Sequence, residues 1–289
     1  MLTLENDCIT VAFHTKGAEL RSVYHKKFHI DYLWNGDETY WNRCSPVLFP
    51  IVGKVKNNTY TYQGQEYQLS QHGFARDTEF VVEQHDQNSI TFSMSSTDQT
   101  KLIYPFDFQL NITYTLLESS LVVAYHVINK GATEQLFSIG AHPAFNCPLE
   151  EGLSFEDYFL EFEKEEITPR LLFGEGAVSR KTEPVFAPNS NTIPLHLDLF
   201  GKKDAIILKD LRSTYMDLKS KRGERGLRFT FEGFPYMGIW TKPGPFICIE
   251  PWFGIADFED ADGKLEHKEG ICKLAVGEDF NASYTTAFF

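Results

Sequence analysis

The chain has 289 residues and a formal net charge of −13, which arises from 27 basic and 40 acidic residues. An anionic field of this size repels phosphate backbones and acidic lipid surfaces, so nucleic acid and membranes are excluded as expected partners. With 42% hydrophobic and 23% charged residues, the composition is that of an ordinary globular protein and excludes global disorder.

The N-terminus has neither the basic region nor the long apolar region of a secretory signal, and we therefore expect a cytoplasmic protein. No apolar run approaches the roughly 18 residues that a membrane span needs. The five cysteines are scattered, without a Cys-x-x-Cys pair or a zinc-type spacing. We expect reduced thiols and no metal site.

A hydrophobic period of two dominates the chain and predicts β-strands. Residues 89–94 and 110–116 alternate between apolar and polar side chains without a break. Shorter runs of strand type occupy residues 9–13, 79–82, 121–128, 158–162, 205–208, 227–231, 246–250 and 284–288. Residues 59–67 are typical of a hairpin, with Gln63-Gly64 at the turn.

More than ten strands and hardly any helix predict an all-β fold. A single sheet of this size would leave an apolar face uncovered, so we expect a large antiparallel β-sandwich of two sheets packed face to face. No linker or repeat divides the sequence, and we expect one domain over residues 1–289. We interpret the two acidic segments, 150–166 and 257–269, as solvated surface.

Three short motifs carry residues that can do chemistry. The turn from Gln71 to Asp77 holds His72 and Arg76 beside a glycine, although taken alone it is typical of an ordinary loop. His142 precedes a proline, which favours extended backbone and allows its ring to face a cleft as a general acid. A hydrogen-bonded structural histidine is an equally good interpretation of His142.

The third motif is the apolar strand that runs into Glu250-Pro251-Trp252. Glutamate is rarely buried without a partner or a function, and desolvation would raise the pKa of Glu250 toward that of a general base working near neutral pH. Trp252, together with Trp240 and Trp34 or Trp41, could offer a flat surface to a sugar ring, although core packing is the commoner role of a tryptophan.

Together these motifs, with Ser45-Pro46-Val47-Leu48-Phe49-Pro50-Ile51-Val52-Gly53-Lys54 before them, resemble the aldose 1-epimerase family and its LacX-like branch in particular. The four motifs occur in the family's order between positions 45 and 254. The resemblance covers essentially the whole chain and implies a β-sandwich of the galactose mutarotase type.

The resemblance also implies a mechanism, in which Glu250 removes the proton of the anomeric hydroxyl and His142 protonates the ring oxygen. It assigns sugar binding to His72 and Asp204, of which the Asp204 match is the weaker. This acid/base chemistry requires neither a metal nor a redox cofactor. Many relatives carry arginine where this chain has Lys54, and lysine cannot make the same two-pronged contact.

The substrate implied is a small sugar, and we expect a free hexose such as galactose or glucose. Arg76 leaves a hexose 6-phosphate open, because a similar turn occurs in relatives that act on such esters and arginine grips phosphate well. Three other classes remain. They are a carbohydrate-binding protein without catalysis, a glycosidase that pairs Glu250 with Asp204 or Asp257, and a purely structural or interaction protein.

Overall fold

The structure is a computed structural model and describes residues 1–174, 177–201 and 205–289. Its described elements are strands arranged in two large sheets and three small ones, with a few short helices. Every pairing between the named strands is antiparallel. The predicted all-β fold is therefore confirmed.

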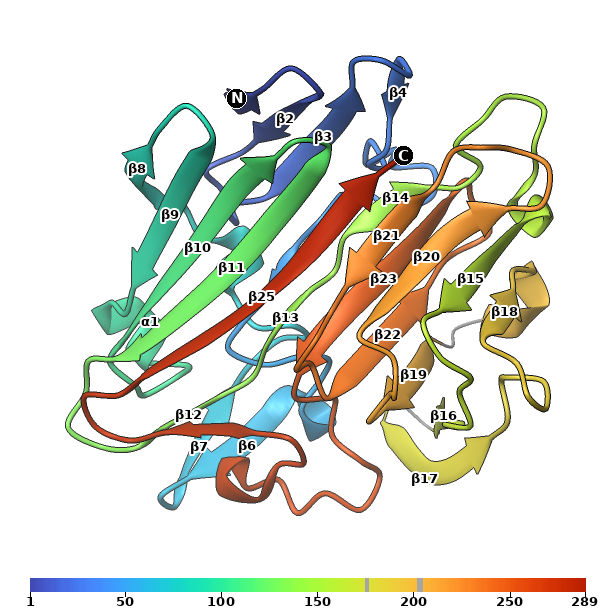
Figure 1. Ribbon diagram of the computed structural model, residues 1–289. Coiled ribbons are helices and arrows are strands. Elements are labelled where there is room, and N and C mark those ends of the chain that lie inside the picture. The colour runs from blue at the N-terminus through green and yellow to red at the C-terminus, as the bar shows by residue number, and fades with distance from the viewer. Residues whose placement is uncertain (175–176, 202–204) are drawn as a thin grey trace.

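The larger sheet has nine strands and extends across the molecule in Figure 1, with β25 in red at its middle. In spatial order its strands are β18 (Thr192–Pro194), β15 (Tyr158–Phe162), β20 (Tyr215–Ser220), β21 (Leu227–Thr230), β25 (Asp279–Phe288), β11 (Ser120–Asn129), β10 (Phe108–Leu117), β9 (Ser89–Ser95) and β8 (Val81–His85). Along β10 and β11 buried and half-buried residues alternate without a break, because successive side chains point to opposite faces of a strand.

The second large sheet has eight strands and carries the motifs that point to function. Its strands in order are β17 (Val178–Glu183), β16 (Arg170–Phe173), β19 (Ile206–Lys209), β22 (Tyr236–Trp240), β23 (Phe246–Phe253), β13 (Ile139–Ala141) and β5 (Val47–Leu48), and β14 (Ala144–Asn146) also pairs with β23. Seven of the eight residues of β23 are buried, as expected for a strand covered on both faces.

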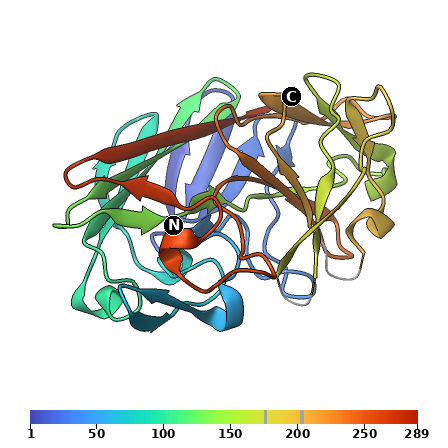
Figure 2. The same ribbon diagram turned by 90° about the horizontal axis from the view of Figure 1, so that it is seen from below.

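The remaining elements are small. They are β1 (Leu2–Glu5), β2 (Ile9–Phe13), β3 (Leu20–His25) and β4 (Ile30–Asp31) in one sheet, the pairs β6 (Thr59–Tyr62) with β7 (Gln65–Gln68) and β12 (Gln135–Phe137) with β24 (Cys272–Leu274), the helix α1 (Asp98–Lys101), and the 3₁₀ turns η1 (Lys56–Asn58), η2 (Ala75–Asp77), η3 (Phe155–Asp157), η4 (Leu197–Phe200) and η5 (Leu265–His267). The β6–β7 hairpin lies at the periphery in both views (Figures 1 and 2).

Local predictions were confirmed in most places. The hairpin turns at Gln63 and Gly64, which both adopt positive φ, as a two-residue turn requires. The strand expected at 79–82 begins only at Val81, because Glu79 forms an isolated bridge with Lys16 instead.

One buried carboxylate departs from the interpretation of residues 150–166 as solvated surface, although the other acidic side chains of this segment are exposed or half-buried. Glu166 is buried and accepts hydrogen bonds from the backbone N–H and the hydroxyl of Ser213, at 2.8 and 2.7 Å. Because both donors replace water, this carboxylate is satisfied inside the protein and anchors the segment that follows β15.

Candidate active site

The sheet register places His142 directly across from Glu250. The short strands β13 and β14 both pair with β23, and their pairings follow one continuous antiparallel register. His142 and Pro143 fall in the gap between β13 and β14, where Pro143 has no N–H to give to a ladder. The residue of β23 opposite His142 in that register is Glu250, so strand pairing alone brings the imidazole and the carboxyl together.

The two groups form a close, buried pair. Nε2 of His142 lies 3.4 Å from Oε2 of Glu250. Glu250 is 1% exposed and His142 is 8% exposed. Burial raises the pKa of Glu250 well above its ordinary value, and the Trp252 side chain opposes part of that rise. Burial also lowers the pKa of His142 to about 3, while a hydrogen bond with its own backbone opposes that change.

Both pKa changes favour the uncharged forms, a carboxylic acid at Glu250 and a free imidazole at His142. In these uncharged forms the pair holds one proton, on Glu250, and carries no net charge. When this proton sits on His142 instead of Glu250, the pair consists of a carboxylate and an imidazolium. A short proton transfer between the two side chains interconverts these forms.

Aromatic side chains surround His142. Trp41 stacks on its ring at a centroid distance of 4.8 Å, and Trp240 meets the ring edge-on at 5.5 Å. The ring of His72 approaches from a third side, at 5.7 Å and nearly perpendicular. These contacts fix the plane of the His142 ring, and Trp41 and Trp240 are themselves only partly buried.

The second histidine has a defined proton position. His72 is buried, and its Nδ1 accepts the backbone N–H of Gly53 at 3.1 Å. Because a backbone N–H can only donate, Nδ1 carries the lone pair and Nε2 carries the proton. Burial and the neighbouring His142 lower the pKa of His72 well below its ordinary value. His72 thus presents a neutral N–H beside the His142–Glu250 pair. The Gln71 side-chain amide lies 3.1 Å from Nε2, and because two donors cannot bond to each other, its oxygen rather than its nitrogen has to face this N–H.

A buried ion pair supports the segment around Gly53, whose backbone N–H bonds to His72. Lys268 and Asp257 lie 2.7 Å apart, and the Lys268 side chain is only 2% exposed. The other carboxylate oxygen of Asp257 accepts the backbone N–H of Lys56 at 2.8 Å, and the Asp257 N–H donates to the carbonyl of Lys54 at 2.8 Å. Asp257 is therefore tied on both sides to the segment that contains Gly53.

This ion pair corrects two expectations from the sequence. Asp257 and Lys268 are buried, so the interpretation of the 257–269 segment as solvated surface is wrong for these two charged residues, whereas Glu259, Asp260 and Asp262 are exposed as expected. Asp257 has also been suggested above as the second carboxyl group of a glycosidase. Its two oxygens are occupied by Lys268 and by a backbone N–H, so it is not free to take that role.

Trp252 belongs to the core. It is 6% exposed, and its ring lies where a Cβ atom on Gly140 or Gly238 would be, at 2.6 and 2.3 Å. Two glycines are thus required to fit one indole between neighbouring strands. The faces of Trp252 are not available for stacking on a sugar. Its Nε1 is buried and makes no hydrogen bond among the described residues.

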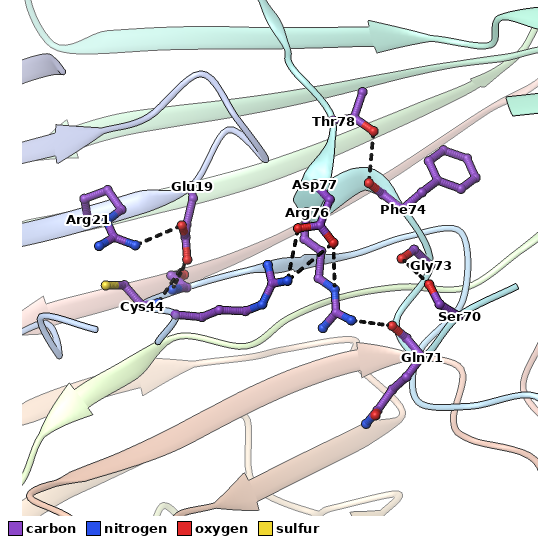
Figure 3. Close-up of polar contacts among 12 residues, drawn as sticks. Glu19, Arg21, Cys44, Ser70, Gln71, Gly73, Phe74, Arg76, Asp77 and Thr78 are labelled. Carbon is purple, nitrogen blue, oxygen red and sulfur yellow. Dashed lines mark hydrogen bonds and ion pairs between the residues drawn. The ribbon is translucent and has the colours of Figure 1, made fainter. Parts of the chain in front are cut away.

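Arg76 lies in a polar network that also includes Arg43. Arg76 donates to the Gln71 carbonyl at 2.6 Å, and its Nε lies 3.6 Å from Asp77, as Figure 3 shows. Arg43 approaches the same carboxylate at 3.0 Å. Burial lowers the pKa of Arg76, and the nearby Arg43 adds to that effect.

A polar cavity of about 230 Å³ opens beside this network. Its lining residues are His14, Lys16, Glu19, Asn42, Arg43, Arg76 and Asp77. The positive charges of both arginines also contribute to the lowered pKa of His142.

The other two predicted binding residues are Lys54 and Asp204. Lys54 is exposed, and its charge contributes to the lowered pKa of His72. Its side chain forms no hydrogen bond or ion pair with the residues that the structure describes. Asp204 lies outside the described residues.

Sequence reasoning missed Arg43 and gave Trp41 only a passing place. Neither residue lies in a recognisable motif, and both reach the site because the loop before β5 folds back over β14 and β23. Cys248 was also missed. Together with His142 and Glu250 it forms the one group of potential metal ligands found among the described residues.

Comparison with known proteins assigns the chain to a family. The family model described as aldose 1-epimerase matches residues 1–265. The plasmid-encoded protein LacX of Lactococcus lactis subsp. lactis is 36% identical over 293 aligned residues, which cover 98% of this chain and 97% of LacX. The chain belongs to the aldose 1-epimerase family.

Solved structures agree with this assignment. A galactose mutarotase related enzyme from Lactobacillus acidophilus is 36% identical, with a TM-score of 0.94 over 100% of this chain and 97% of that one. A galactose mutarotase-like protein from Lactobacillus casei is 32% identical, with a TM-score of 0.94 over the full length of both chains. The galactose mutarotase-like sandwich expected from the sequence is thus confirmed. Among the described residues, the helices lack the length and apolar character to cross a bilayer.

The buried ion pair allows a test of stability. Replacement Lys268→Met leaves the Asp257 carboxylate buried without its cation, and we expect a loss of about 3–5 kcal/mol in the free energy of unfolding. The matched control is Lys209→Met, which removes an exposed pair with Glu269 and should cost at most about 1 kcal/mol. Urea denaturation measures both values. Equal losses in the two variants would show that the Lys268 pair has no special role.

The raised pKa of Glu250 predicts a pH-dependent cost of burial. The unfolded chain ionises Glu250 more readily than the folded chain does, so the stability contribution of this group is complete below the unfolded pKa and is lost as the pH rises through the folded pKa. Glu250→Gln removes this loss. We expect the variant to be more stable than the wild type at pH 7–8 and the difference to shrink toward pH 4. Thermal unfolding across this range, with exposed Glu134→Gln as control, would contradict the account if the difference did not depend on pH.

Proposed function

We propose that this protein is an aldose 1-epimerase that interconverts the α and β anomers of a free hexose such as galactose or glucose. The observation that carries the proposal is the buried pair of Glu250 and His142 at 3.4 Å, at the two positions that the family resemblance assigns to base and acid. The neutral His72 donor beside this pair supports it further.

The reaction needs one proton removed and one proton delivered. Glu250 takes the proton of the anomeric hydroxyl while His142 gives a proton to the ring oxygen, and the bond between the anomeric carbon and the ring oxygen breaks. The open-chain aldehyde turns about the adjacent carbon–carbon bond and closes by the reverse steps. Both roles become available when the single proton of the free pair moves from Glu250 to His142.

The surrounding residues supply the binding contacts. The Nε2–H of His72 donates toward the ring oxygen, and the partly exposed Trp41 offers an aromatic face to the apolar side of the sugar. Lys54 has an exposed ammonium group for a hydroxyl, and Asp204 keeps the role of hydroxyl acceptor that the resemblance gives it. Trp252 acts on Glu250 rather than on the sugar, because its buried indole N–H opposes part of the rise in the pKa of Glu250.

A phosphorylated hexose is the second candidate substrate. Arg43 and Arg76 line one polar cavity and share the single carboxylate of Asp77. Two guanidinium groups in such an arrangement retain positive charge for a phosphate ester. A binding protein without catalysis is the remaining alternative, since a sugar cleft requires no acid/base pair.

The test is the rate of anomer exchange, measured by NMR in weak buffer for galactose, glucose and glucose 6-phosphate. General acid/base catalysis contributes about 10²- to 10⁴-fold, and we expect Glu250→Gln to lose most of the acceleration while sugar binding survives. The Glu134→Gln control should keep full activity, because that residue is exposed.

The outcomes separate the candidates. Acceleration of a free hexose supports the proposal. Acceleration of the phosphate ester alone, lost in Arg76→Gln, would assign the protein to phosphorylated sugars. Sugar binding by the wild type without any acceleration would leave a carbohydrate-binding protein and contradict the proposal.

A further inference from the structure

Three different metal-ligating side chains meet at the centre of the site. Cys248 and Glu250 are two residues apart on β23, so they project from the same face of the strand, and His142 lies across from Glu250. One ligand atom from each of the three residues lies within 4.8 Å of the other two. The proposed reaction uses Glu250 and His142, and it gives no role to the Cys248 thiol.

The donor atoms are buried and incompletely satisfied. Cys248 is 0% exposed and Glu250 is 1% exposed. Glu250 Oε2, the oxygen that faces His142 Nε2, has no hydrogen-bond partner among the described residues. A buried polar atom without a partner costs free energy, and a ligand that bonds to such atoms recovers that cost.

The chemistry of this set selects a class of ion. Thiolate, imidazole and carboxylate are the zinc-binding groups of proteins, with bond lengths of about 2.0–2.3 Å, whereas Mg²⁺ and Ca²⁺ require oxygen ligands. An ion centred among three donors spaced 3.4 Å apart, the observed distance between His142 and Glu250, would lie about 2.0 Å from each. All three separations are within 4.8 Å, so the widest has to shorten by up to about 1.4 Å to reach this spacing.

We propose that His142, Cys248 and Glu250 form a binding site for a soft divalent cation of the Zn²⁺ type, and that its occupation inhibits the acid/base pair. Binding releases the proton of the Cys248 thiol and the proton held by the pair to solvent. The lone pairs of Glu250 and His142 then bind the metal and can no longer accept protons during the reaction. The inhibitory part rests on the proposed epimerase function, whereas the binding part does not.

Cobalt absorption tests binding without any assay of activity. Co²⁺ added to the metal-free protein should give a thiolate-to-cobalt charge-transfer band that Zn²⁺ abolishes by displacement. The band should persist in Cys272→Ser, where a partly buried cysteine elsewhere in the fold is removed, and vanish in Cys248→Ser and Cys248→Ala. The two variants guard against failure of one to fold. No band, or a band that survives both substitutions at Cys248, would overturn the proposal.

Anomer exchange tests inhibition. We expect Zn²⁺ to suppress exchange in the wild type, EDTA to restore it, and the Cys248 variants to require at least tenfold more Zn²⁺. Cobalt binding at Cys248 without inhibition of an active enzyme would refute the inhibitory part. Inhibition that is unchanged by Cys248→Ala would refute the site itself. If the wild type accelerates no sugar, the epimerase proposal fails, and the cobalt spectrum still decides on the metal site.

Discussion

The strand register that sets His142 opposite Glu250 is the constraint on which the site depends. Two short strands, β13 and β14, pair with the buried strand β23 on either side of the His142-Pro143 step. This pairing fixes the position of the imidazole, and the Glu250 carboxyl group opposite it is shielded from water. A pair placed by backbone pairing is held more rigidly than one carried by loops, as acid/base chemistry requires.

Desolvation has the largest effect on the protonation state of this pair. Charged forms are costly inside the sheet, so the raised pKa of Glu250 and the lowered pKa of His142 both favour the uncharged pair with a single proton. The rest of the site maintains this environment. The Lys268–Asp257 ion pair holds the segment that fixes the proton position of His72, and Gly140 and Gly238 make room for the Trp252 ring.

Local patterns in the sequence predicted much of this. Alternation predicted strands such as β10 and β11, and Gln63-Gly64 predicted a hairpin turn, because these features depend on a few neighbouring residues. The buried state of Glu166, Asp257 and Lys268 could not be predicted, since acidic segments are usually solvated and the partners lie far away in the sequence. Arg43 joins the site through tertiary packing alone, whereas Cys248 lies two residues before Glu250 on β23 and could have been noticed from that spacing. Trp252 packs in the core because two glycines on neighbouring strands leave room for it.

Burial of both groups favours a pair that is uncharged in the free protein, with a neutral imidazole at His142. ¹⁵N NMR of the histidine rings tests it directly, with the His142 signals assigned from their loss in His142→Gln. The account predicts a neutral imidazole at pH 7 that stays neutral as the pH falls well below 6.5, because burial lowers its pKa to about 3. An imidazolium at pH 7, or a titration midpoint near 6.5, would contradict it.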